Sequence, residues 1–223
     1  MFPLKDDIPA ERAPVVCILL IVINVLAFLY ELSFGPSIER FVTAYAVVPG
    51  RFSHDPVGQL STLFTSMFLH GGWGHLFGNM LYLWIFGDNV EDRLGHAGFL
   101  AFYLVCGLAA GFAHILTNAG SMVPTVGASG AIAGVLGAYL VLFPRARVLT
   151  LTPWFSTILV PSIFFLGIWF LMQVFSGAVQ LSVARGTGGV AFLAHVGGFV
   201  MGALIGGIVG TITRGAGRER ARI

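Results

Sequence analysis

Long runs of hydrophobic residues, separated by shorter polar segments, dominate this chain. A helix needs about 20 mostly apolar residues to cross a bilayer. Six runs approach or exceed that length, at about 14–34, 73–90, 97–116, 127–143, 154–181 and 190–213, and Pro161 is expected to kink the fifth. Lipid offers no hydrogen bonds to an exposed backbone, so such runs are expected to be helical. The pattern predicts an all-α, polytopic bundle of six transmembrane helices.

The segments between and around these runs define the domain organisation. Residues 1–13 form a short tail, 14–213 the six-helix membrane domain, and 214–223 a basic tail. The long first connection, residues 35–72, contains prolines and charges and is too polar to cross. Its aromatic residues Phe41, Tyr45 and Phe52 are expected to lie at the membrane interface.

The cations between the runs predict an orientation. With a cytoplasmic N-terminus, nine Lys or Arg residues lie inside and only Arg40, Arg51 and Arg185 lie outside. Because cytoplasmic loops carry the excess of Lys and Arg, both chain ends are placed in the cytoplasm. The inner cations are Lys5, Arg12, Arg93, Arg145, Arg147, Arg214, Arg218, Arg220 and Arg222.

Composition supports a membrane protein. Hydrophobic residues make up 57% of the chain and charged residues only 10%, whereas soluble domains carry roughly 25% charged residues. The 30 glycines suit close helix packing in lipid. These values exclude an ordinary soluble domain and predict a multi-pass integral membrane protein.

Polar side chains inside the runs indicate chemistry, because they are costly in hydrocarbon. The second, fourth and sixth helices would all run inward from the outer side. His75 and Asn79 lie early in the second, Ser129 early in the fourth and His195 early in the sixth. The four side chains are therefore expected to meet at one depth in the outer leaflet.

A serine becomes a nucleophile when a histidine takes its proton. No acidic residue is expected near His195, so Ser129 and His195 are interpreted as a dyad. His75 and Asn79, spaced i and i+4 on one helix face, could donate hydrogen bonds to an oxyanion. The backbone N–H of Ser129, at a helix start, could do the same.

Other interpretations of these residues stay open at this point. Each could merely pack or join helices, and the two histidines could serve a transporter relay or bind haem. A zinc protease would require His-Glu-x-x-His, which is absent from the sequence, and an aspartyl protease would need a partner for Asp88.

Several motifs together resemble the rhomboid family of intramembrane serine proteases, over residues of about 59–213. They are Phe68-Leu69-His70 with His75 and Asn79, Glu91-Asp92-Arg93-Leu94-Gly95, Gly127-Ala128-Ser129-Gly130, and Ala194-His195 with Gly198 and Gly202.

The resemblance implies a specific function. It makes Ser129 the nucleophile, His195 the base and acid, and His75, Asn79 and the Ser129 N–H the oxyanion hole. Phe77 matches a position that in the family packs against the fifth helix, and movement of that helix is expected to admit the substrate. The implied activity is hydrolysis of a peptide bond in or near the membrane segment of single-span substrates, through an acyl-enzyme and without metal or cofactor.

The same resemblance implies a location and partners. It places the protein in a prokaryotic cell (inner) membrane, with the bilayer and membrane proteins as partners and no nucleic acid. A catalytically silent binder of membrane proteins is the alternative.

Two positions depart from some family members. Ala133 stands where those members carry an aromatic ring against the histidine, so packing of Gly130 and Gly134 against the sixth helix is expected to hold His195 instead. The first connection also lacks a Trp-Arg pair.

Overall fold

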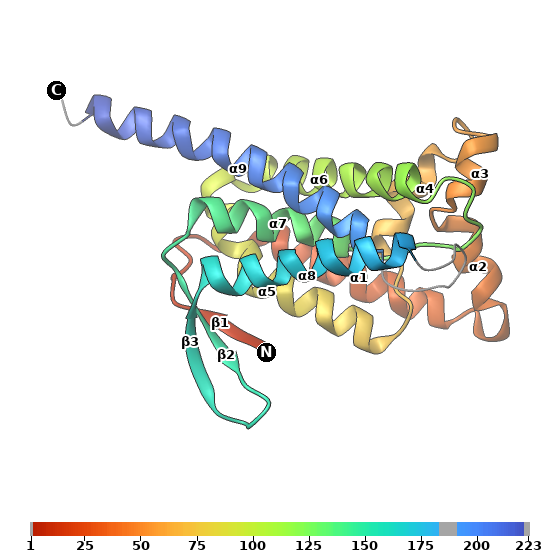
Figure 1. The fold of residues 1–223 in the computed structure, drawn as a ribbon, viewed down its shortest axis with the longest axis horizontal. Helices are drawn as coiled ribbons and strands as arrows, with labels where there is room; N and C mark the ends of the chain where they lie inside the picture. Colours follow the sequence, from red (N-terminus) through yellow and green to blue (C-terminus); the bar gives the residue numbers. More distant parts are fainter. Residues whose placement is uncertain (1, 183–190, 221–223) are drawn as a thin grey trace.

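Long helices lie side by side and form most of the molecule (Figure 1). The computed structural model describes residues 2–182 and 191–220. Each predicted run overlaps one long helix. The six are α1 (Val15–Leu32), α5 (Trp73–Leu94), α6 (His96–Thr117), α7 (Ser129–Leu142), α8 (Ser162–Ser182) and α9 (Phe192–Arg220).

Membrane-spanning character is clear in four of these helices. Among the described residues, α1, α6, α8 and α9 are long and apolar enough to cross a bilayer. The α7 helix is apolar but shorter, and α5 is not among the four. The protein is therefore an integral membrane protein with a mostly helical bundle, and six crossings stay a prediction.

The central helix of the bundle is α7. Every residue from Gly130 to Tyr139 is buried, and Figure 1 shows α7 between its neighbours. It packs mainly against α9, α6 and α5. Because α7 has no face directed outward over this stretch, its first residue, Ser129, borders the protein interior and is itself partly buried.

Short helices form the first connection, at the end of the bundle opposite the sheet (Figure 1). Phe41 stacks on Phe34 with ring centroids 4.2 Å apart. Phe52, predicted to lie at the membrane interface, is instead buried with Val47, Leu63 and Ile115. It therefore fastens the connection to α6. The elements are η1 (Gly35–Ser37), α2 (Ile38–Tyr45), α3 (Pro49–His54), α4 (Leu60–Thr65) and η2 (Ser66–Phe68).

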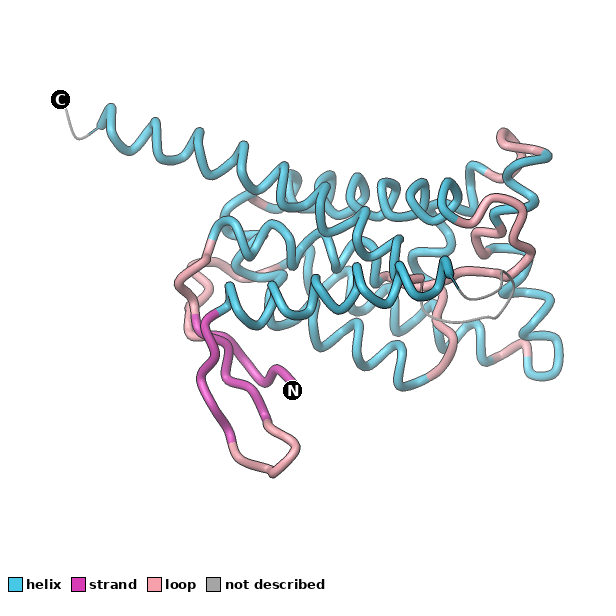
Figure 2. Tube along the Cα trace, in the orientation of Figure 1, coloured by secondary structure: helices cyan, strands magenta, loops and turns pink. Residues whose placement is uncertain are grey.

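A small sheet corrects the prediction of a purely helical chain. Strands β1 (Phe2–Asp6), β2 (Arg147–Leu151) and β3 (Thr157–Pro161) are antiparallel in the order β1-β2-β3, as Figure 2 shows. The supposed tail 1–13 therefore contributes a strand.

The same sheet corrects the start of the fifth predicted helix. Residues 157–161 pair with β2 rather than forming helix, and α8 begins at Ser162. Pro161 ends the strand instead of kinking the helix. Ser162 donates its N–H to the carbonyl oxygen of Ala146 at 2.7 Å, which joins the start of α8 to the segment after α7.

The N-terminal strand and the far end of α9 lie towards the same end of the bundle (Figure 1). This placement agrees with chain ends on one side of the membrane, while the cytoplasmic orientation stays a prediction. The α9 helix continues to Arg220, past the predicted end at residue 213. Arg185, Val190 and residues 221–223 lie outside the described residues.

Candidate active site

Ser129 is the first residue of α7, and the loop before it is held close to η2 and α5. Gly127 donates its N–H to the carbonyl oxygen of Ser66 at 2.8 Å. Its φ of +129° is rare for residues with a side chain, and an added Cβ would lie 2.7 Å from Nε2 of His75. A glycine at 127 therefore lets the serine loop approach His75.

Small residues bring α7 and α9 into backbone contact. A Cβ added at Gly198 would collide with the carbonyl oxygen of Gly130, and one added at Gly202 with that of Gly134. Close approach through small residues is the usual packing mode of membrane helices. The predicted packing of Gly130 and Gly134 against the sixth helix is present, and it brings the start of α9 beside the start of α7.

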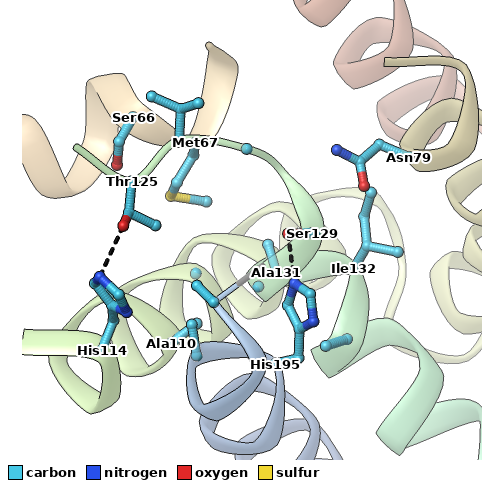
Figure 3. Close-up of a pocket in the computed structure, with 18 of the residues that line it drawn as sticks. Ser66, Met67, Asn79, Ala110, His114, Thr125, Ser129, Ala131, Ile132 and His195 are labelled. Carbon is cyan, nitrogen blue, oxygen red and sulfur yellow. Dashed lines mark hydrogen bonds between the residues drawn. The ribbon is translucent and has the colours of Figure 1, made fainter. Parts of the chain in front are cut away.

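Ser129 and His195 meet across this contact. Oγ of Ser129 lies 2.7 Å from Nε2 of His195, within hydrogen-bond distance (Figure 3). Both side chains are partly buried and line a cavity of about 800 Å³. The structure therefore brings together the two residues that the sequence singled out as nucleophile and base.

His75 and Asn79 reach the same cavity from α5. Gly71 donates its N–H to Nδ1 of His75 at 3.3 Å, so the ring proton resides on Nε2. Asn79 is buried, and its Nδ2 has no hydrogen-bond partner within the described part of the chain. Figure 3 shows Asn79 on the side of the cavity near Ser129. The two side chains thus offer two N–H donors to a group bound near Ser129.

The residues around the His195 ring were not anticipated. Nδ1 of His195 lies 2.8 Å from Oε1 of Gln173, and the Trp169 ring lies 6.1 Å from the imidazole centroid. Both residues belong to α8. The signal that could have indicated Gln173 is a polar amide inside a predicted membrane helix. The glycine contacts position the helices, whereas side chains of α8 contact the imidazole itself.

His114 of α6 also lines the cavity, and the sequence reasoning missed it as well. Its Nε2 lies 2.7 Å from Oγ1 of Thr125 (Figure 3). A histidine inside a predicted membrane helix was again the available signal. His114 and Thr125 add a polar patch to an otherwise largely apolar wall.

Phe77, the predicted gate residue, lies on the outside of α5. Its side chain is 63% exposed, and its ring stacks on Trp73 of the same helix with centroids 5.6 Å apart. It is not among the residues that line the cavity. The role of Phe77 at the α8 helix therefore stays a prediction.

No group of three or more His, Cys, Asp or Glu side chains that could hold a metal ion occurs within residues 2–182 and 191–220. The polar side chains that line the cavity are instead four hydroxyls (Ser66, Tyr82, Thr125 and Ser129), two amides (Asn79 and Gln173) and three imidazoles (His75, His114 and His195). This set suits proton transfer and hydrogen bonding to a carbonyl group.

Comparisons with known proteins agree with these motifs. A family model described as the Rhomboid domain matches residues 57–212. The mitochondrial Rhomboid protein 1 of Saccharomyces cerevisiae is 32% identical over 191 residues, which cover 82% of this chain and 50% of that protein. The human mitochondrial Presenilin-associated rhomboid-like protein is 32% identical over 133 residues, covering 57% of this chain and 33% of that protein.

RHOMBOID-like protein 5 of Arabidopsis thaliana is 37% identical over 83 residues, covering 37% of this chain and 27% of that protein. The aligned regions thus span half or less of the length of these curated relatives.

Proposed function

Since this chain belongs to the rhomboid family, whose members are generally intramembrane serine proteases, we propose that it is a serine endopeptidase of membrane proteins. It hydrolyses a peptide bond in or near the transmembrane segment of single-span substrates. The observation that carries the proposal is the 2.7 Å contact between Oγ of Ser129 and Nε2 of His195 inside the cavity.

The proposed reaction begins with proton transfer from Ser129 to Nε2 of His195 as the serine oxygen attacks the substrate carbonyl. The resulting oxyanion accepts hydrogen bonds from Nε2–H of His75, Nδ2–H of Asn79 and the backbone N–H of Ser129. His195 then donates the proton to the leaving amine. A water molecule, activated by the same histidine, hydrolyses the acyl-enzyme and restores Ser129.

The site's surroundings support a membrane substrate. Four helices of the described chain are apolar enough to span a bilayer, and α8, on one side of the cavity, exposes large apolar residues such as Ile168, Leu171 and Phe175. We propose six crossings with both ends in the cytoplasm, which places Ser129 in the outer leaflet. The prokaryotic cell membrane stays a prediction, because the yeast and human relatives named above are mitochondrial proteins.

The test is cleavage of a single-span substrate by the purified protein in liposomes. We expect wild type to cleave, and Ser129→Ala and His195→Ala to lose cleavage while remaining folded. Ser61→Ala and His54→Ala serve as matched controls, because both residues are exposed and lie outside the cavity. These controls should retain wild-type rates.

Labelling of Ser129 by a fluorophosphonate probe gives a readout that needs no substrate. Cleavage that survives in Ser129→Ala would refute the proposed nucleophile. A wild-type protein that neither cleaves nor takes the label would instead support a silent binder of membrane proteins.

A further inference from the structure

The imidazole of His195 is hydrogen-bonded at both of its nitrogens. Nε2 lies 2.7 Å from Oγ of Ser129 and Nδ1 lies 2.8 Å from Oε1 of Gln173. Gln173 lies on α8 and His195 on α9, so the second contact comes from a different helix than the one that carries the histidine. The ring therefore connects α7, α8 and α9 through two polar contacts.

The partner at Nδ1 decides where the ring proton resides. With Oε1 of Gln173 facing the ring, which can only accept a hydrogen bond, Nδ1 carries the proton and donates it to this oxygen. Nε2 then presents its lone pair to the hydroxyl of Ser129. The opposite tautomer would require the Gln173 amide to turn over and donate from its NH₂ group, and it would leave no base beside Ser129.

A second residue of α8 limits the tilt of the ring. Trp169 lies one helical turn before Gln173, on the same face. Its ring is inclined by 31° to the imidazole, with centroids 6.1 Å apart. Ala133 of α7 offers only a methyl group at the position where an aromatic ring could have stood. The orientation of the base is thus set by α8.

We propose that Gln173 is a positioning residue that holds His195 in the tautomer able to deprotonate Ser129. This inference rests on the proposed protease function and deepens it, because Gln173 becomes a neutral third residue that orients His195 and takes up no proton itself. An amide suits this place, since an isolated carboxylate among apolar membrane helices would carry a large desolvation cost.

Two substitutions separate hydrogen bonding from packing. Gln173→Leu keeps a branched side chain of similar size but removes the acceptor, while Gln173→Glu keeps oxygen atoms at the same reach. Gln180→Leu is the matched control, because Gln180 lies two turns further along α8 and does not line the cavity.

The assay is cleavage kinetics in liposomes, together with the rate of fluorophosphonate labelling at Ser129. We expect Gln173→Leu to lower kcat and the labelling rate by about 10-fold or more, the effect of losing one buried hydrogen bond, with KM unchanged. Gln173→Glu should restore both rates to within about 3-fold of wild type, since a carboxyl group that its apolar surroundings keep neutral still accepts the same hydrogen bond through its carbonyl oxygen. Gln180→Leu should match wild type.

The inference is overturned if Gln173→Leu keeps the wild-type kcat, or if Gln173→Glu is as impaired as Gln173→Leu. A merely structural role would instead lower the thermal midpoint of both variants without the rescue by glutamate. A wild type that cleaves nothing would refute the proposed function, and the following measurement would still test the hydrogen bond.

Nitrogen-15 NMR of histidine-labelled wild-type protein reports the tautomer without any variant at Gln173. Comparison with His195→Ala assigns the signals. We expect His195 to carry its proton on Nδ1. A neutral ring protonated on Nε2 would overturn the proposal, whatever the kinetic variants show.

Discussion

Glu91 of α5 provides the hydrogen bonds that the start of α1 lacks. The first N–H groups of a helix have no partner inside the helix, and Pro14 at the start of α1 offers no side-chain cap. Oε1 of Glu91 accepts the N–H of Val16 at 2.9 Å, and Oε2 accepts that of Cys17 at 2.8 Å. Nδ1 of His96 lies 2.5 Å from Oε1. A carboxyl group that is 2% exposed thus joins α1 to α5.

Glu91→Gln keeps the shape of this side chain but replaces one oxygen with an NH₂ group. Because both oxygens accept, the amide must face at least one buried donor and leave it unsatisfied, at a cost of about 1–3 kcal/mol. Loss of negative charge at a helix N-terminus adds about 0.5–1 kcal/mol. We expect the free energy of unfolding to fall by about 2–4 kcal/mol.

The adjacent residue is a matched control. Asp92 also accepts two backbone N–H groups, from Glu11 at 2.6 Å and from Arg12 at 3.1 Å, but these hydrogen bonds are exposed. Water can replace an exposed acceptor, so Asp92→Asn should cost less than about 1 kcal/mol. The two substitutions remove the same chemical group and differ mainly in burial.

The assay is reversible unfolding in mixed micelles of rising dodecyl sulfate content, followed by circular dichroism. Glu91→Gln should shift the midpoint to lower dodecyl sulfate, and Asp92→Asn should barely move it. Equal losses in the two variants would refute the argument that burial sets the cost. A loss below about 1 kcal/mol for Glu91→Gln would show that its hydrogen bonds are readily replaced.

Two further predictions concern the helix contact and the sheet. Gly202→Ala should lower the free energy of unfolding by about 1–3 kcal/mol and slow cleavage, because the added Cβ collides with the backbone of Gly134. Gly207→Ala is the control: an added Cβ there has no atom within 4 Å, so stability and cleavage should stay unchanged. Burial raises the pKa of the Asp6 carboxyl above its ordinary 3.8, and the hydrogen bond from Tyr139 offsets part of that rise. The folded protein therefore binds the Asp6 proton more tightly than the unfolded chain does. The protonated carboxyl stabilises the folded state below a pH of about 4, and this stabilisation is lost as the pH rises through the raised pKa. Asp6→Asn should remove that pH dependence from the thermal midpoint, and an unchanged slope would contradict it.

Helix positions were accessible from sequence because the membrane imposes a simple rule. A run of apolar residues that must satisfy its own backbone becomes a helix, and the ends of α5 and α6 lie within a few residues of the predicted limits. The strand at residues 157–161 was missed because its apolar residues continue directly into those of α8. A hydropathy pattern does not separate the two states, whereas pairing with β2 does.

The candidate site likewise contains residues that the sequence indicated and one that it did not. Ser129, His195, His75 and Asn79 were recognisable because each is a costly polar residue at a similar depth in a predicted span. Gln173 also lies in a predicted span, but the helical pattern does not say which polar residue faces a neighbouring helix. Its partner lies 22 residues away on α9, so only the packing of α8 against α9 could pair them.

By itself, the sequence determined the membrane class, the approximate positions of the long helices and the candidate residues that we propose as nucleophile, base and oxyanion donors. Those properties depend on hydropathy and on side-chain chemistry, which are local. The sequence predicted that Gly130 and Gly134 pack against the sixth helix, but only the tertiary structure decided that they approach Gly198 and Gly202 closely enough for a 2.7 Å contact between Ser129 and His195. The tertiary structure also decided that an amide from α8 faces the second nitrogen of the imidazole, because such contacts depend on how helices distant in sequence pack together.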